Sequence, residues 1–140
     1  MSQTRHLLIV DDDLDDQELL LEALKEAGFT GEISRADDGD EALAHIRGEG
    51  PRPDLILLDL HMPRMRGFEV LAQMGADPAL RAIPVVVLTT SWSEEDISRA
   101  YQLGVNSFII KPVLFDELVQ TAQSLLHFWF ELSELPPAGA

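Results

Sequence analysis

Four short apolar runs, each ending at a polar residue, constrain the fold of this chain more than any other feature. They lie at residues 7–10, 55–58, 85–88 and 108–110, and a stretch with helical periodicity follows each one. Short apolar runs that alternate with helical patterns are typical of an α/β fold, in which helices connect buried parallel strands. We therefore predict one parallel sheet with helices on both faces.

The same pattern predicts the bounds of five strands and five helices. We expect strands at 6–10, 32–36, 54–58, 84–89 and 106–110, and helices at 15–27, 40–47, 67–75, 93–104 and 114–130. The second strand is the most polar, which predicts a sheet edge. Gly28 and Gly104 are expected to end the first and fourth helices, and Ser93 to cap the fourth. The first helix is expected to turn four residues to the core: Leu19, Leu20, Ala23 and Leu24.

Composition favours one acidic domain. The chain has 140 residues, 10 Lys plus Arg against 25 Asp plus Glu, a formal net charge of -15 and no cysteine. Five strand–helix units fill the sequence, so we expect one domain over 1–132, a tail over 133–140 and no output domain. The negative charge argues against nucleic acid and anionic membranes as partners, and no apolar stretch reaches transmembrane length. A cytoplasmic location is therefore expected.

Polar side chains follow the apolar runs where each run ends. Asp11 and Asp12 follow the first, Asp59 the second, Thr89 the third and Lys111 the fourth. Ligands of open α/β sheets bind beyond the carboxyl ends of the strands, so we expect these side chains to share one crevice. Taken singly, each has an ordinary interpretation as a helix cap, loop acid, strand-end hydroxyl or surface cation. Their joint placement is what favours a functional site.

Carboxylates, a hydroxyl and an ammonium in one crevice suit a divalent metal and a phosphoryl group. Mg²⁺ prefers oxygen ligands: Asp12 and Asp59 could bind it directly, Asp11 through a water, and a backbone carbonyl near His61 could add a ligand. A carboxylate can also act as a nucleophile and form an aspartyl phosphate. Such a transfer depends on positioning and charge neutralisation, which the metal, the lysine and the threonine hydroxyl would supply.

Four motifs resemble the receiver domain of two-component response regulators. They are Leu-Ile-Val-Asp-Asp-Asp at 8–13, the stretch 53–67, Val-Val-Leu-Thr at 86–89 and Lys-Pro at 111–112, in the family's order over nearly the whole chain. The resemblance implies a flavodoxin-like, doubly wound sheet of strand order 2-1-3-4-5 with five helices. It also implies a signalling protein that catalyses only its own phosphorylation and dephosphorylation.

The resemblance gives each matching residue a role. Asp59 is expected to be the phosphoacceptor, and Asp11 and Asp12 the acidic pair that binds Mg²⁺ together with Asp59. Lys111 is expected to contact the phosphoryl group, and Thr89 to be the switch hydroxyl. These roles agree with the chemistry inferred from the residues themselves.

Further expectations come from the same family. Phe108 matches its switch aromatic, and the Lys111–Pro112 bond is expected to be cis, a form that an X–Pro bond tolerates cheaply. His61 and Ser91 stand two residues after the phosphoacceptor and the switch hydroxyl. In the family, side chains at these positions gate the hydrolytic water, so both are expected to tune the lifetime of the phosphoryl group.

Two stretches, 77–91 and 128–136, are similar to single-domain regulators paired with bacterial phytochromes. This similarity implies that a sensor histidine kinase, in this subgroup a phytochrome, donates the phosphoryl group. Without an output domain, the signal would be a change in protein–protein contacts.

The helix over 114–130 has more apolar positions than a half-buried helix needs. Five form an ordinary core stripe at three- and four-residue spacing: Phe115, Leu118, Ala122, Leu125 and Trp129. A second set comprises Val119, Leu126, Phe128 and Phe130. This second set predicts a homodimer through the fourth helix, fifth strand and fifth helix; the alternative is a C-terminal segment that folds back over the core.

Two other interpretations use the same acids. Asp11, Asp13, Asp15 and Glu22 have the spacing of an EF-hand loop, but its sixth position lacks glycine and a strand, not a helix, precedes it. Asp11 and Asp13 could instead serve an aspartate-nucleophile phosphohydrolase, for which the chain is short. Neither gives Asp59 a role, so we prefer the receiver interpretation.

Overall fold

A five-stranded parallel sheet forms the centre of the computed structural model, which describes residues 5–49, 51–62, 66–90, 92–132 and 135. The strand order is β2-β1-β3-β4-β5, which confirms the predicted doubly wound fold. The strands are β1 (His6–Val10), β2 (Glu32–Ala36), β3 (Leu55–Leu58), β4 (Val85–Thr89) and β5 (Ser107–Ile110). The polar strand β2 lies at an edge, as its sequence predicts.

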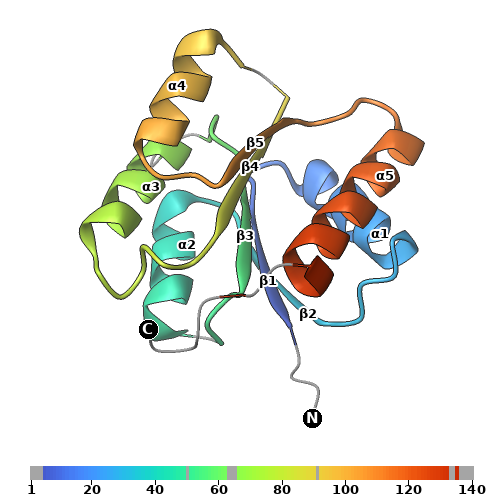
Figure 1. Cartoon of the computed structure of the whole chain (residues 1–140), viewed down its shortest axis with the longest axis horizontal. Coiled ribbons are helices and arrows are strands. Elements are labelled where there is room, and N and C mark those ends of the chain that lie inside the picture. The colour runs from blue at the N-terminus through green and yellow to red at the C-terminus, as the bar shows by residue number, and fades with distance from the viewer. Residues whose placement is uncertain (1–4, 50, 63–65, 91, 133–134, 136–140) are drawn as a thin grey trace.

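Helices cover both faces of the sheet. On one face lie α1 (Leu14–Glu26) and α5 (Phe115–Leu126); on the other lie α2 (Gly39–Ala44), α3 (Gly67–Ala76) and α4 (Glu94–Gln102) (Figure 1). Because successive strand residues point to opposite faces, Leu8 packs under α2 and α3, whereas Leu7 and Ile9 pack under α1 and α5. Both faces of the central strands are therefore buried, which explains their uninterrupted apolar runs.

Helix ends lie largely where the sequence predicts them. The Ser93 Oγ accepts a hydrogen bond from the Asp96 N–H at 3.1 Å and caps α4. Gly28 and Gly104 follow α1 and α4 with φ angles of 95° and 100°, which glycine adopts at little cost. After α2, a π-helical turn over His45–Glu49 takes the place of the predicted last turn. Among the helices that the structure describes, none has both the length and the hydropathy needed to cross a membrane.

Two expectations about inward-facing residues are wrong. Leu19 is 50% exposed, because it lies beside the buried stripe of α1 and not on it. That stripe follows three- and four-residue spacing: Gln17, Leu20, Ala23 and Leu24. Phe115 is 36% exposed because it is the first residue of α5.

The apolar residues that follow α5 fold back on the core. A π-helical segment, His127–Leu132, continues the helix, and Trp129 and Phe130 pack against the core beside α1. Phe130 stacks on Phe29, with the ring centroids 5.7 Å apart. The fold-back interpretation therefore accounts for most of the second apolar set, while Phe128 stays 50% exposed.

The first residue of α3 approaches the end of β3 closely. A Cβ on Gly67 would lie 2.7 Å from the Asp59 carbonyl oxygen and 2.7 Å from the Leu60 Cα. Both are backbone atoms, so neither can move aside as a flexible side chain would. The Gly67 N–H also donates to the Leu60 carbonyl at 3.2 Å. The absence of a side chain at this position thus lets the α3 backbone sit directly against the residues that follow β3.

We predict that Gly67→Ala destabilises the fold by about 1–3 kcal/mol, because the added methyl group overpacks a backbone contact. Gly75→Ala is the matched control in the same helix: its Cβ would meet only the Leu103 carbonyl oxygen, at 3.8 Å. The control is expected to be neutral or more stable, since alanine favours helix over glycine. Urea unfolding of the three proteins measures both effects. Equal stability of Gly67→Ala and wild type would refute the close approach.

Candidate functional site

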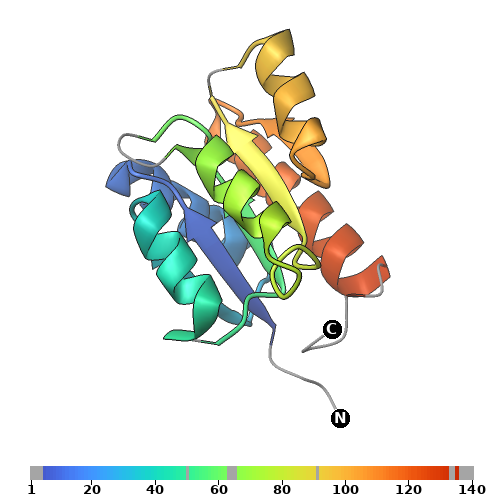
Figure 2. The ribbon, with the colours of Figure 1, turned by 90° about the vertical axis from the view of Figure 1, so that its left-hand side faces the viewer.

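The hydrogen-bond ladder of the sheet continues one residue beyond three strands and so positions the predicted site residues. All strands run in the same direction, which places their carboxyl ends at one edge (Figure 2). There the Asp59 N–H donates to the last carbonyl of β1 at 2.9 Å, and the Lys111 N–H donates to the last carbonyl of β4 at 2.8 Å. The Asp11 N–H donates to the last carbonyl of β2 at 3.2 Å.

Three of the predicted acids come together at this edge. Carboxylate oxygens of Asp11, Asp12 and Asp59 all lie within 4.8 Å of one another. Asp11 is buried, Asp59 half-buried and Asp12 exposed, so the group is open to solvent on one side. Three negative charges against the one positive charge of Lys111 leave an excess of two, which fits a divalent cation with oxygen ligands.

The Asp59 carboxylate is held by two donors. The buried Thr89 hydroxyl donates to Asp59 Oδ1 at 2.8 Å, and the His61 N–H donates to the same oxygen at 3.2 Å. The structure thus joins the second and third apolar runs through one side-chain hydrogen bond, as the strand-end placement predicts. The order β3-β4 in the sheet makes this contact possible.

Lys111 reaches across the site to the acids that follow β1. Its Nζ lies 2.9 Å from Asp11 Oδ2 and 3.6 Å from Asp16 Oδ2. The other Asp11 oxygen, Oδ1, accepts the Asp13 N–H at 3.0 Å. The first turn of α1 thus brings Asp16, an acid for which the sequence predicted no role, to the lysine.

Burial and charge act in opposite directions on the pKa values of this pair. Burial raises the pKa of Asp11 above its ordinary value, and the hydrogen bonds from Asp13 and Lys111 offset this only in part. Burial by itself lowers the pKa of Lys111, but Asp11, Asp16 and Asp59 more than compensate, and the lysine pKa is raised. Lys111 is thus held in its charged form, and a bound cation would lower the pKa of Asp11 again.

The acids of the EF-hand spacing do not form a loop around a cation. The Asp13 carboxylate caps α1 by accepting the N–H groups of Asp15 and Asp16 at 2.9 and 3.1 Å. Asp15 is an exposed residue in the first turn of α1. The run of acids therefore serves two purposes. Asp11 and Asp12 at the end of β1 belong to the site, whereas Asp13 caps the start of α1.

Gln17 is a buried residue of this edge that the sequence did not reveal. Its Nε2 donates to the Asp11 carbonyl and, at 2.9 Å, to Asp37 Oδ1, and it lies 3.5 Å from the Ala36 carbonyl. It thereby joins the loop after β1 to the loop after β2. A polar residue in an amphipathic helix ordinarily indicates the solvent face. The sequence pattern therefore does not predict that Gln17 is buried.

Three further expectations concern Phe108, Ser91 and the Lys111–Pro112 peptide bond. Phe108 is half-buried and packs against the core under α2, α3 and α4. Ser91 lies outside the described residues. The expectation of a cis Lys111–Pro112 bond is wrong, because the described part of the chain contains no cis peptide bond; trans is the lower-energy form for X–Pro.

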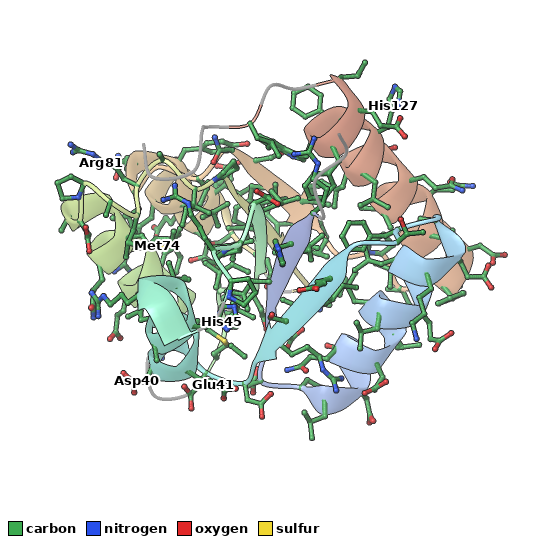
Figure 3. The ribbon with its side chains drawn as sticks, turned by 90° about the horizontal axis from the view of Figure 1, so that it is seen from below. Asp40, Glu41, His45, Met74, Arg81 and His127 are labelled. Carbon is green, nitrogen blue, oxygen red and sulfur yellow. The ribbon has the colours of Figure 1, made fainter. Side chains whose placement is uncertain are left out.

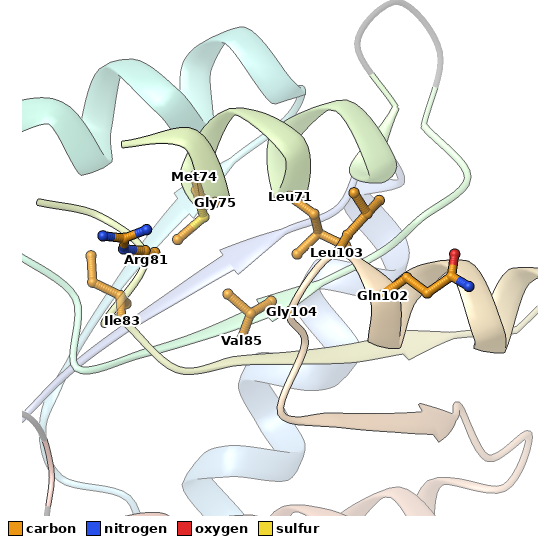
Figure 4. Close-up of a pocket in the computed structure, with 9 residues that line it drawn as sticks. All are labelled: Leu71, Met74, Gly75, Arg81, Ile83, Val85, Gln102, Leu103 and Gly104. Atoms are coloured by element: carbon orange, nitrogen blue, oxygen red, sulfur yellow. The ribbon is translucent and has the colours of Figure 1, made fainter. Parts of the chain in front are cut away.

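A pocket of about 350 Å³ lies at the opposite end of β4, between α3 and the end of α4 (Figure 4). Its lining includes Leu71, Met74, Ile83, Val85, Leu103 and Arg81. Figure 3 shows Met74 and Arg81 on this side of the sheet, across from His127 at the end of α5. Val85 begins β4 and Thr89 ends it, so roughly 13 Å of strand separates the pocket from the acidic edge. The pocket is therefore not part of the candidate site.

We predict that Gln17→Ala lowers the free energy of unfolding by about 1–3 kcal/mol, because a buried Asp11 carbonyl loses its donor. Glu18→Ala is the matched control: Glu18 is exposed and pairs with Arg35 at the surface at 2.6 Å. Its loss is expected to cost at most about 1 kcal/mol. Chemical denaturation of both variants tests the assignment, which a larger cost for Glu18→Ala would contradict.

Comparison with known proteins agrees with this geometry. The family model of the response regulator receiver domain matches residues 7–123. Among curated relatives, the "Probable methanogenesis regulatory protein FilR2" of Methanothrix harundinacea is 41% identical over 93% of this chain and 86% of its own length. The response regulator Rcp1 of Synechocystis is 40% identical over 94% of this chain and 93% of its own length.

Solved structures show the same relationship. The phosphorylated cyanobacterial phytochrome response regulator RcpA is 41% identical, with a TM-score of 0.89 over 96% of this chain and 100% of its own. The Mn²⁺-bound form of Rcp1 is 40% identical, with a TM-score of 0.86 over 95% of this chain and 99% of its own. Motifs, fold and near full-length relatives therefore agree that this chain belongs to the response regulator receiver domain family.

Proposed function

We propose that this chain accepts a phosphoryl group from a phosphohistidine of a sensor kinase onto Asp59. The observation that carries the proposal is the half-buried Asp59 carboxylate, fixed by Thr89 at 2.8 Å and close to Asp11, Asp12 and the charged Lys111. In the transfer, an Asp59 oxygen forms a bond to phosphorus while the bond from phosphorus to the kinase histidine breaks. The departing imidazole nitrogen takes up a proton from solvent.

The acidic trio would hold Mg²⁺ during this reaction. Asp11, Asp12 and Asp59 supply oxygen ligands and an excess of negative charge, and the His61 backbone carbonyl is proposed as a further ligand. When bound, the cation neutralises charge on the phosphoryl oxygens. The Mn²⁺-bound structure of the relative Rcp1 supports a divalent metal at this kind of site.

Lys111 and Thr89 would act on the phosphoryl group itself. The Lys111 Nζ, already placed among acids, offers its charge to a phosphoryl oxygen. The Thr89 hydroxyl, which now donates to Asp59, would turn to a phosphoryl oxygen. The movement of Thr89 would let the half-buried Phe108 turn inward, and phosphorylation would thereby shift the population of two conformations of the chain.

The phosphohydrolase alternative has no support in the comparisons, and the geometry argues against it. It requires Asp13 as a second acid beside Asp11. The Asp13 carboxylate caps α1. The chain is instead proposed to catalyse only its own phosphorylation and dephosphorylation, the latter tuned by His61 and Ser91.

A phytochrome is the proposed sensor kinase. Support comes from the similarity to RcpA, a phytochrome response regulator, over nearly the whole of both chains. The encounter would take place in the cytoplasm. The net charge of -15 favours a basic docking surface on the partner.

A homodimer is proposed through the face formed by α4, β5 and α5. Two large apolar side chains are half exposed on it, Tyr101 at 49% and Ile110 at 45%, and Val113 follows in the adjoining loop at 97%. The strand β5 also lies at the edge of the sheet. A second copy of the chain would cover this apolar surface.

We predict that a sensor kinase labels the wild-type protein in the presence of Mg²⁺ and does not label Asp59→Asn. The matched control is Asp54→Asn, at the opposite end of β3, where an amide oxygen can still accept the His6 N–H that Asp54 now accepts at 2.9 Å. This control is expected to be labelled like wild type. Phosphotransfer from candidate kinases, including a phytochrome, provides the measurement. Labelling of Asp59→Asn would overturn the proposed site.

We predict that Ile110→Glu weakens self-association at least tenfold, because it places a charge in the apolar contact. Leu19→Glu, which alters an equally exposed leucine on α1, is expected to leave it unchanged. Sedimentation velocity with and without phosphorylation tests both variants. A wild-type protein that remains monomeric in both states would refute the dimer.

A further inference from the structure

We propose that Asp96 on α4 positions the His61 imidazole and thereby prolongs the lifetime of the phosphoryl group on Asp59, an inference that rests on the proposed function. The His61 Nε2 lies 3.4 Å from Asp96 Oδ2. The same residue donates its backbone N–H to Asp59 Oδ1 at 3.2 Å. His61 therefore connects the phosphoacceptor directly to the first turn of α4.

The face that α4 turns to α3 is well suited to hold Asp96 in place. Residues three and four apart in a helix share one face, so Asp96, Arg99 and Ala100 point together. The Arg99 guanidinium lies 4.3 Å above the ring of Phe68 on α3, and Ala100 is buried. The Ser93 cap fixes the helix start beside Asp96. These contacts determine where the Asp96 carboxylate stands.

Few contacts hold α4 against the rest of the chain, so the His61–Asp96 pair contributes substantially to the position of the helix. Within α4, every residue of which the structure describes, only Ala100 is buried. The C-terminal end of the helix borders the pocket lined by Gln102 and Leu103. The buried Ala100 and the contact of Arg99 with Phe68 lie in the last turn of the helix, whereas the His61–Asp96 pair holds its first turn.

The chemistry of phosphoryl loss gives this pair a consequence. A water attacks phosphorus, the bond from phosphorus to the Asp59 oxygen breaks, and the products are the free carboxylate and dihydrogen phosphate, which keeps both protons of the water. An imidazole nitrogen beside the phosphorus could orient that water. Nε2 is the ring nitrogen farthest from the backbone, and Asp96 holds it at α4. Asp96 thus keeps the His61 Nε2 away from the attacking water, and the water loses the ring nitrogen that could best orient it.

The test uses acetyl phosphate with Mg²⁺ as the phosphodonor, so that no kinase is needed. After removal of the donor, intact-protein mass spectrometry follows the loss of the phosphoryl group. Asp96→Ala is expected to shorten the half-life roughly two- to fivefold, the scale of one partly exposed side-chain contact. Asp96→Asn, whose amide oxygen can still lie beside the His61 Nε2, should keep the wild-type half-life. Glu95→Ala removes a neighbouring acid of the same helix turn and should have no effect.

A double-mutant cycle separates positioning from a general effect on α4. In a His61→Ala background, Asp96→Ala is expected to change nothing further, because the imidazole it releases is absent. An unchanged or longer half-life for Asp96→Ala alone, or an equal shortening in both backgrounds, would overturn the inference while leaving Asp59 as phosphoacceptor. A wild-type protein that acetyl phosphate does not label on Asp59 would instead refute the proposed function and the inference with it.

Discussion

The buried ion pair between Lys111 and Asp11 is the interaction on which the acidic edge depends. Its members stand 100 residues apart in the chain and follow the fifth and the first strand, with β3 and β4 between them. Without the lysine, the carboxylates of Asp11, Asp12 and Asp59 would repel one another within 4.8 Å. With it, the site keeps an excess of two negative charges. Burial raises the pKa of Asp11, while the neighbouring acids outweigh burial at Lys111 and raise its pKa, so the ammonium keeps its charge. A site of this kind is ready to receive a divalent cation and then a phosphoryl group.

The fold and the positions of the site residues could be predicted because they depend on local patterns. Apolar runs of strand length separated by helical periodicity define the sheet, and parallel strands bring their carboxyl ends to one edge. Asp59 and Thr89 could therefore be placed together although 30 residues separate them. Glycine conformations at 28 and 104 and the Ser93 cap are equally local, since each depends on a single residue at a helix end. The strand order could be expected only from the family resemblance, because the apolar runs do not determine which strands are neighbours in the sheet.

Contacts that depend on the rotation of a helix about its axis were not predictable from the same patterns. The rotation of α1 against the sheet buries Gln17, exposes Leu19 and brings Asp16 to 3.6 Å from Lys111. Successive helix residues lie about 100° apart, so the sequence pattern leaves open which residues at the border of the apolar stripe face the core. The pair of His61 and Asp96 joins a loop to a different helix, and no sequence period connects them.

The sparse packing of α4 suggests how a chemical change at Asp59 could reach the surface proposed for partner binding. A conformational change requires only a difference in free energy between two states, and a helix with one buried residue has little packing to oppose it. The contact of α4 with His61 lies in its first turn, and its contact with Phe68, made by Arg99, lies in its last turn beside the exposed Tyr101. Because a helix moves as a rigid unit over such a short length, a displacement at Asp96 is carried to Tyr101. Thr89 and His61 contact the same Asp59 oxygen, so β4 and α4 would both respond to a phosphoryl group bound there. The proposed coupling of chemistry to binding would then need no long network, because one carboxylate oxygen connects the two elements that border the proposed face.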